Sequence, residues 1–229
     1  NNYVSWCWKA NGGTTSSNSD GSVTSTVQAN TDAGFSIVTY TGTGSGNTIG
    51  HGLGVTPDWI IVKVRSTTNN WGVWHQDLGG ANKYLKLNTT DSTITATDVW
   101  NNTLPTSTVF STGAAGTTND SGATYVAYCF AEKKGYSKFG KFRGNANADG
   151  PFIYTGFKPA WLMIKNIGAS GTGYHWYIWD NKRDTINVMD NTLHGDENTA
   201  ENTFDQDIDF LSNGFKLRGS GVGMNPNSH

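Results

Sequence analysis

The sequence predicts an all-β protein built from two similar antiparallel β-sandwich or jelly-roll units of about 100 residues each. Short apolar runs recur between turn signals along nearly the whole chain. Asn, Thr and Ser dominate the polar positions, and they favour turns and strands over helices. A tryptophan-containing segment also occurs twice, about a hundred residues apart, which indicates an internal repeat.

The repeated segment reads TPDWIIVKVR at residues 56–65 and KPAWLMIK at residues 158–165. In both copies a proline stands two residues before a tryptophan, and apolar residues then run to a lysine. This pattern is typical of a buried strand entered from a rigid turn. We therefore expect Trp59 and Trp161 to occupy equivalent buried positions in two units that superpose.

The match extends outward from this segment in both directions. WGVW at 71–74 corresponds to WYIW at 176–179, and GFS at 34–36 corresponds to GYS at 135–137. A third match aligns YVSWCW at 3–8 with YVAYCF at 125–130, including the cysteine. These matches predict an N-terminal aromatic strand with a Gly/Ser/Thr-rich linker at 1–33, a first repeat at 34–134 and a second at 135–229.

Each predicted strand is a short apolar or alternating run between turn signals. A possible edge strand at 22–30 precedes them. In the first repeat we expect strands at 35–40, 59–65, 71–75, 83–87, 109–111 and 125–130. In the second repeat we expect them at 152–154, 161–165, 176–179, 185–189 and 214–217.

Charge and hydropathy exclude some partners. The formal net charge is −2 and the pI is near 6.2, so no basic field is available to bind nucleic acid. No apolar run approaches the roughly 20 residues of a membrane helix, so we expect a soluble protein with no membrane insertion. The chain begins with Asn1 instead of methionine, which we interpret as a fragment of a longer protein.

The two cysteines, Cys7 and Cys129, are too few for a disulfide framework and lack nearby ligand partners for zinc. We expect two buried thiols. Because the two cysteines occupy equivalent positions in the third match, a disulfide bridge between them is the alternative.

Five segments carry a resemblance to a known family: HGLGVTPDWIIVK at 51–63, the W-x-x-W strand at 71–74, YVAYCFAE at 125–132, GFKPAWLMIK at 156–165 and WYIWDNKRD at 176–184. In these segments the sequence resembles a domain of unknown function that recurs in tail-fibre-like structural proteins of marine bacteriophages, including phages of cyanobacteria. The resemblance covers most of the chain from Tyr3 to Arg218. The resemblance implies a non-enzymatic virion protein that binds other copies of itself and other virion proteins, with neighbouring lectin-like domains. The family carries no established catalytic residues.

The W-x-x-W strands are the main surface candidates. Residues three apart on a strand point to opposite faces, so each pair can leave one indole exposed as a platform for a sugar. The predicted glycan-binding residues are Trp74, His75, Trp179 and Asp180. The alternative, which is more common for strand aromatics, is that both tryptophans are buried.

Three alternating aspartates and one histidine are further candidate ligand residues. Asp205, Asp207 and Asp209 alternate along the chain, so an extended backbone would place three carboxylates on one side, where calcium could bind. The spacing lacks the glycine and distal glutamate of a known calcium loop, and we favour a solvated acidic surface. His51 stands between two glycines, and we expect it to hold a turn.

No catalytic motif of the serine-elbow, zinc-helix or phosphate-loop kind occurs in the sequence. We therefore expect no enzyme, no tightly bound cofactor and no catalytic metal, since no ligand set with usable spacing is evident. Our principal hypothesis is a tail-fibre or appendage domain of a virion, for assembly and host-surface recognition. The alternatives are a lectin-like glycan-binding module and a tailspike-type polysaccharide hydrolase using a pair such as Asp180 and Asp184.

Counting from the repeat suggests a role for the N-terminal stretch. The second repeat ends without the strand that closes the first, whereas residues 3–8 are a spare copy of that strand type. A sandwich lacking a strand exposes unpaired backbone groups. We predict that residues 3–8 form a paired strand that fills this place, in the same chain or in the next copy.

Overall fold

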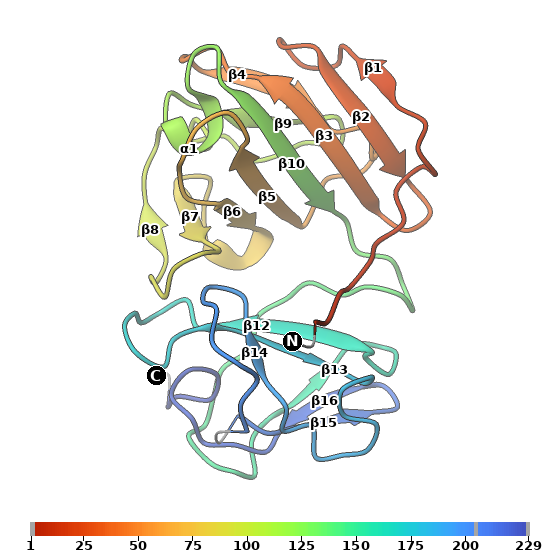
Figure 1. The fold of residues 1–229 in the computed structure, drawn as a ribbon, viewed down its shortest axis with the longest axis vertical. Coiled ribbons are helices and arrows are strands. Elements are labelled where there is room, and N and C mark those ends of the chain that lie inside the picture. Colours follow the sequence, from red (N-terminus) through yellow and green to blue (C-terminus); the bar gives the residue numbers. More distant parts are fainter. Residues whose placement is uncertain (1–2, 204–205, 228–229) are drawn as a thin grey trace. The chain divides into compact units, whose positions relative to one another are not determined.

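The structure is a computed structural model that describes residues 3–203 and 206–227. Within these ranges it contains sixteen strands, one four-residue α-helix and one short 3-10 helix, so the predicted all-β class is confirmed. The chain forms two compact units (Figure 1). Unit 1 takes the described residues of 1–84 and 95–133, and unit 2 takes those of 85–94 and 134–229.

A large antiparallel sheet dominates unit 1. Its strands, in spatial order, are β1 (Ser16–Asn18), β2 (Ser25–Asn30), β3 (Phe35–Thr41), β10 (Thr124–Phe130), β5 (Trp59–Val64), β6 (Gly72–His75), β7 (Lys83–Lys86) and β8 (Ile94–Thr95). Strand β1 arises from the stretch predicted as a linker, whereas β2 lies within the edge strand predicted at 22–30. The chain passes from one unit to the other within β7 and β8.

Strand β10 is central to the sheet because it pairs with β3 on one side and β5 on the other (Figure 1). Its side chains alternate as the sequence pattern predicts: Tyr125, Ala127 and Cys129 are buried on the inner face. The opposite face carries Phe130, whose ring lies 4.8 Å from that of Phe35 and 5.1 Å from that of Trp59. Both faces of the sheet therefore bury apolar area here.

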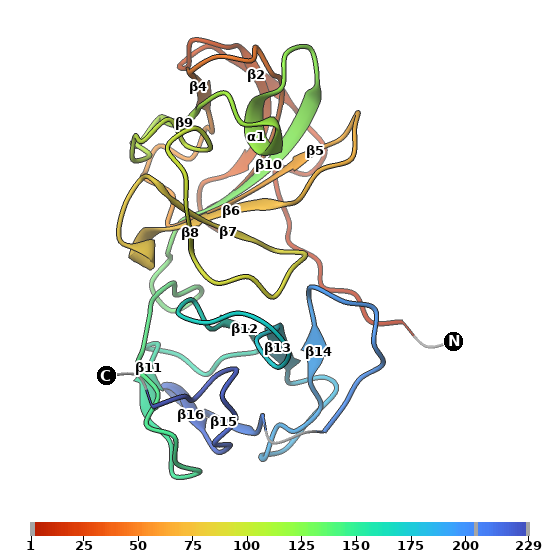
Figure 2. The same cartoon turned by 90° about the vertical axis from the view of Figure 1, so that its left-hand side faces the viewer.

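A second layer covers the inner face. It consists of the strand pair β4 (Asn47–Gly50) and β9 (Val109–Thr112), which lies against the large sheet (Figure 2). Ile49 and Phe110 from this pair are fully buried in one cluster with Val62 and Tyr125 of the large sheet. The short helices η1 (Gln76–Leu78) and α1 (Gly116–Asn119) lie in the connections. Unit 1 is thus a two-layer β-sandwich.

The structure of residues 3–8 differs from the predicted closing strand. Residues 3–8 form no strand and pair with no strand in this chain, so the predicted closing strand is wrong within the chain. Trp8 instead packs its ring edge against Phe130 at 6.3 Å, and the Asn30 side chain donates to the Lys9 carbonyl at 3.1 Å. Both contacts attach this stretch to unit 1 without a strand pairing.

Unit 2 contains two three-stranded antiparallel sheets. One has the order β12 (Trp161–Lys165), β13 (Trp176–Asp180) and β14 (Leu193–His194), and the other β11 (Phe152–Tyr154), β16 (Gly214–Leu217) and β15 (Ile208–Leu211). A single buried cluster joins them, because Tyr177 and Trp179 from the first sheet pack with Phe210 and Phe215 from the second. This arrangement is also sandwich-like.

Each unit contains a hairpin of its own, and the two hairpins have the same register. Trp59 of β5 faces His75 of β6, and Trp161 of β12 faces Asp180 of β13. The next pair inward is Ile60 with Trp74 in unit 1 and, correspondingly, Leu162 with Trp179 in unit 2. The repeated sequence segment therefore makes the same local structure twice.

Outside this hairpin the units differ. Strand β5 has β10 as a second neighbour, whereas β12 is the edge strand of its sheet. For this reason Trp59 is buried and Trp161 is only half-buried, so the predicted equivalence of their burial is wrong. The repeat of a whole sandwich unit stays a prediction.

The strand predicted at 185–189 is also wrong. Only Met189 makes a backbone bridge there, to Ile208, while side chains of Asp180, Arg183 and Asp184 hold the rest of this loop. The apolar residues in the segment suggested a strand, but Ile186 is exposed.

Candidate functional site

The predicted glycan platform does not exist at the proposed tryptophans. Trp74 is 4% exposed and Trp179 is fully buried, because both project from the inner face of their hairpins into a core cluster. A buried indole offers no face to a sugar. The predicted binding role of Trp74 and Trp179 is therefore wrong, because both side chains are buried.

The polar neighbours of these tryptophans have structural contacts. The Nδ1 of His75 accepts a hydrogen bond from the Asp77 amide at 3.1 Å and caps η1. The Asp180 carboxylate is buried and accepts hydrogen bonds from the Lys182 and Arg183 amides and from the Arg183 Nε. Burial acts to raise the pKa of Asp180, but these hydrogen bonds and the Arg183 charge lower it overall. His75 and Asp180 therefore organise turns.

Asp180 and Asp184, the candidate pair for hydrolysis, also make hydrogen bonds within the protein. Asp184 is buried and accepts hydrogen bonds from the amide and the side chain of Asn191. Asp180 is neutralised by Arg183. Both carboxylates are thus occupied by neighbouring protein groups, whereas hydrolysis needs one carboxyl group as the acid and the other as the base or nucleophile at the glycosidic bond.

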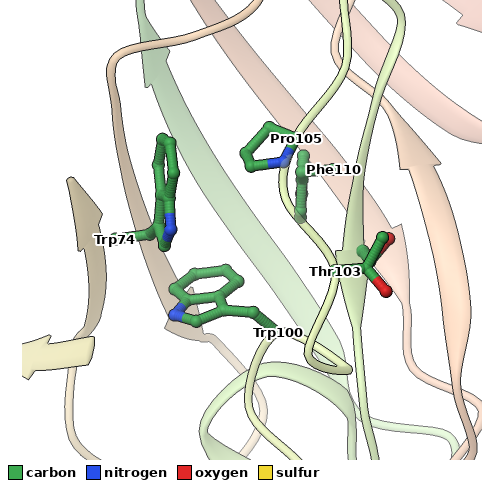
Figure 3. A pocket seen from close by; sticks show the side chains of 6 residues that line it. Trp74, Trp100, Thr103, Pro105 and Phe110 are labelled. Carbon is green, nitrogen blue, oxygen red and sulfur yellow. The ribbon is translucent and has the colours of Figure 1, made fainter. Parts of the chain in front are cut away.

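A small hollow in unit 1 lies beside Trp74. It measures about 140 Å³ between its lining atoms, and Figure 3 shows the Trp74 and Trp100 indoles opposite Pro105 and Phe110. This hollow is too narrow to hold a water molecule, so we interpret it as a packing gap in the core.

Two of the three predicted calcium residues contact protein groups near Arg218. Asp205 lies outside the described residues. Asp209 pairs with Arg218, whose Nε lies 3.4 Å from its Oδ2, and the backbone carbonyl of Asp207 accepts from the amides of Arg218 and Gly219. A neighbouring arginine competes with a cation for the Asp209 carboxylate, so this surface does not favour calcium.

His51 holds a turn as predicted. It is fully buried, its Nδ1 accepts from the Leu53 amide at 3.2 Å, and its Nε2 lies 3.1 Å from the Thr106 carbonyl. One nitrogen accepts and the other donates, which requires the neutral ring. Burial lowers the pKa of His51, although the contact with Thr106 opposes that shift.

A cluster of titratable side chains in unit 2 was missed by the sequence analysis. His175 stands immediately before β13 and His194 ends β14, while Asp196 and Glu197 follow in the next turn. Strands β13 and β14 pair Tyr177 with His194, which brings His175 beside His194 across the hairpin. We refer to His175, His194, Asp196 and Glu197 as the histidine cluster.

The two imidazoles in this cluster are stacked. Their centroids are 4.2 Å apart and their planes differ by 4°. The Nδ1 of His175 lies 2.9 Å from the Oδ2 of Asp196, and the Nδ1 of His194 lies 2.5 Å from the Oε1 of Glu197. The same Glu197 oxygen lies 3.5 Å from the Nδ1 of His175. Both rings thus direct Nδ1 toward the Glu197 carboxylate, and His175 also contacts Asp196.

Neighbouring groups hold these four side chains in place. The Trp176 amide donates to the Oδ1 of Asp196 at 2.8 Å, and the Thr199 hydroxyl donates to the Oε1 of Glu197 at 3.1 Å. The ring of Tyr177 contacts both imidazoles edge-on. The hydrogen bond from His194 lowers the pKa of Glu197, so this group carries a negative charge at neutral pH.

The sequence shows no set of metal ligands with usable spacing, but the histidine cluster contains one. One ligand atom from each of His175, His194 and Glu197 lies within 4.8 Å of the other two. The available signal was the string HGDE at 194–197, but its partner His175 lies across a long loop and only strand pairing places it nearby.

The cysteines are both free thiols. Cys129 is buried as predicted, whereas Cys7 is exposed and the alternative of a bridge is not realised. Burial raises the pKa of Cys129 to about 12, so this thiol is inert at neutral pH.

An exposed aromatic pair lies on unit 2. Phe152 and Tyr154 occupy alternate positions of β11, the edge strand of its sheet, and are 45% and 66% exposed. Ile153 between them packs into the core cluster, so the two rings share the opposite, outer face. We refer to Phe152 and Tyr154 as the β11 aromatic pair.

Comparison with known proteins identifies one family. The family model described as a domain of unknown function (DUF7483) matches residues 1–228. No curated protein and no solved structure matches the chain. Over residues 3–203 and 206–227 the structure has no helix long and apolar enough to cross a membrane.

Proposed function

We propose that this chain, which belongs to the family described as a domain of unknown function (DUF7483), is a non-enzymatic structural domain of a virus particle. In this proposal it forms part of a tail fibre or related appendage, assembles with other copies of itself and with other virion proteins, and contacts the host surface. The resemblance of its repeated tryptophan segments to phage appendage domains suggests the setting. The structural observation that carries the proposal is the β11 aromatic pair.

The β11 aromatic pair has the character of an assembly contact. Among residues 3–203 and 206–227, β11 pairs with β16 alone, so its outer backbone edge can accept a strand from another molecule. Two aromatic rings on one face of such an edge would lose their exposed apolar area on contact, and aromatic residues are enriched in protein interfaces. We therefore assign this surface to contact with a second copy of the chain.

A second candidate function, glycan binding, is favoured by polar groups beside the same rings. Lys216 stands opposite Phe152 on β16, and its Nζ lies 2.8 Å from the Oδ1 of Asp149. Aromatic faces flanked by charged hydrogen-bonding groups suit a sugar, whose ring stacks on the aromatic while its hydroxyls bond the polar groups. This candidate replaces the buried Trp74 and Trp179 as the recognition surface.

Two measurements on the same proteins separate these functions. Light scattering after size-exclusion chromatography should show concentration-dependent association that is lost in a Phe152→Ser/Tyr154→Ser variant. Tyr136→Ser is the matched control, because Tyr136 is an exposed tyrosine of unit 2 outside β11. A glycan array on these three proteins should show no β11-dependent signal if the surface serves assembly alone.

The virion setting needs a separate test. An antibody against this chain, applied to purified virus particles that encode it, should label an appendage in immunogold electron micrographs. Unlabelled particles would contradict the virion proposal, and a chain that stays monomeric at all concentrations would contradict assembly through β11. Release of reducing ends from host polysaccharide by the purified chain would show an enzyme and overturn the non-enzymatic assignment.

A further inference from the structure

The histidine cluster brings together the donor atoms that transition metals bind. Imidazole nitrogen and carboxylate oxygen are the usual ligands of zinc and its neighbours in proteins. Here two imidazoles and the Glu197 carboxylate converge from one hairpin and the turn after it. From this convergence we propose that His175, His194 and Glu197 bind one divalent transition-metal ion of the zinc class, with Asp196 positioned beside His175.

The distances suit such an ion. Two ligands at about 2.0–2.1 Å from zinc in a tetrahedron are about 3.4 Å apart. The Nδ1 of His175 and the Oε1 of Glu197 are separated by 3.5 Å, which is this spacing. The His194 Nδ1 and Glu197 Oε1 are closer, at 2.5 Å, because a hydrogen lies between them. The Glu197 side chain is one-third exposed, so it can move outward as the ion enters.

Metal binding would replace a hydrogen on each ring. In the structure each Nδ1 directs its hydrogen to a carboxylate. The ion would take the place of these hydrogens, and each hydrogen would pass to Nε2 of its own ring or, where Nε2 already carries one, leave as a proton to solvent. Because the rings are stacked in parallel, one ion would lie near the plane of both only after they tilt apart.

The surrounding contacts prepare the site. The Asp196 side chain is 2% exposed and is fixed through its Oδ1 by the Trp176 amide, which leaves its Oδ2 toward His175. The two histidine side chains are largely buried, and Tyr177 limits their rotation from one side. Supporting contacts of this kind orient metal ligands and strengthen binding.

The consequence for the fold is a cross-link within unit 2. Strands β13 and β14 contribute only two register pairs between them, Tyr177 with His194 and Ile178 with Leu193. An ion held by residues before β13 and after β14 would close this short ladder. We infer that the ion is structural and stabilises the hairpin and the turn at 195–199.

The test uses the full chain without an affinity tag. Protein treated with a chelator is dialysed against Zn²⁺, and the bound zinc is measured by elemental analysis and calorimetry. We expect one zinc per chain and a higher melting temperature with zinc than without. His175→Asn and His194→Asn should each weaken zinc binding by about tenfold or more. His75→Asn is the matched control, because His75 lies in unit 1 and Asn can retain its capping oxygen.

A second measurement needs no substitution. Among the five histidines of the chain, only the ring signals of His175 and His194 should shift in NMR spectra when Zn²⁺ is added. The proposal is overturned if the wild-type chain binds no zinc, if both histidine variants bind as tightly as wild type, or if other histidine signals shift in place of these two.

Discussion

The Nε of Arg183 lies 2.8 Å from the Oδ2 of Asp180, and this ion pair joins the end of β13 to the loop that follows it. The same guanidinium donates to the carbonyls of Ile178 and Asn191 and to the Glu201 carboxylate. One side chain thus satisfies groups from three parts of unit 2.

Arg183→Ala should lower the free energy of unfolding by about 2–4 kcal/mol, because it leaves the buried Asp180 carboxylate without its cation. Glu201→Gln is the control. The Glu201 side chain is 41% exposed, so its loss should cost about 0–1 kcal/mol. Denaturant unfolding measures both, and equal stability of the two variants would contradict the assignment.

Trp179→Ala should destabilise the protein by about 3–5 kcal/mol, because Trp179 is fully buried in the core of unit 2. Trp161→Ala should cost clearly less, since Trp161 is half-buried on an edge strand. The Nε1 of Trp179 has no hydrogen-bond partner within the described ranges, so Trp179→Phe should recover most of the loss. The prediction fails if Trp161→Ala proves the more damaging change in equilibrium unfolding.

His51 should make stability depend on pH. Its folded-state pKa is lowered from the usual value near 6.5, mainly by burial. The unfolded chain therefore binds the proton first, and the stability due to neutral His51 is complete above about pH 6.5 and is lost as the pH falls through the folded-state pKa. Unfolding free energies at pH 7.5 and pH 5 should differ more in wild type than in His51→Asn. An identical pH dependence in both proteins would show that His51 does not contribute.

The two thiols should react very differently. At pH 8 a thiol reagent should modify Cys7 rapidly, while Cys129 stays protected until the protein is denatured, because burial raises the pKa of Cys129 to about 12. Counting modified thiols per chain with and without denaturant measures this. Cys7→Ser should abolish the rapid reaction. Rapid modification of both thiols would contradict the buried position of Cys129.

Local patterns in the sequence were sufficient to predict most strands. The Pro-x-Trp segment and the W-x-x-W segment predicted strands β5, β6, β12 and β13, because alternation along a strand and the turn before it are properties of neighbouring residues. Their pairing into two hairpins came from the structure. The same patterns predicted the burial of Cys129 in β10 and the turn held by His51. The segment 185–189 was predicted wrongly, because apolar residues alone do not show whether a partner strand is present.

By itself the sequence determined the all-β class and the strands that recur around each tryptophan. Only the tertiary structure decided that Trp74 and Trp179 face the core, that residues 3–8 pack through Trp8 instead of pairing, and that His175 meets His194. The reason is physical: a strand pattern specifies two faces, but which face is covered depends on the sheet layer that packs against it. In the same way, side chains far apart in sequence meet only where backbone pairing brings their strands together.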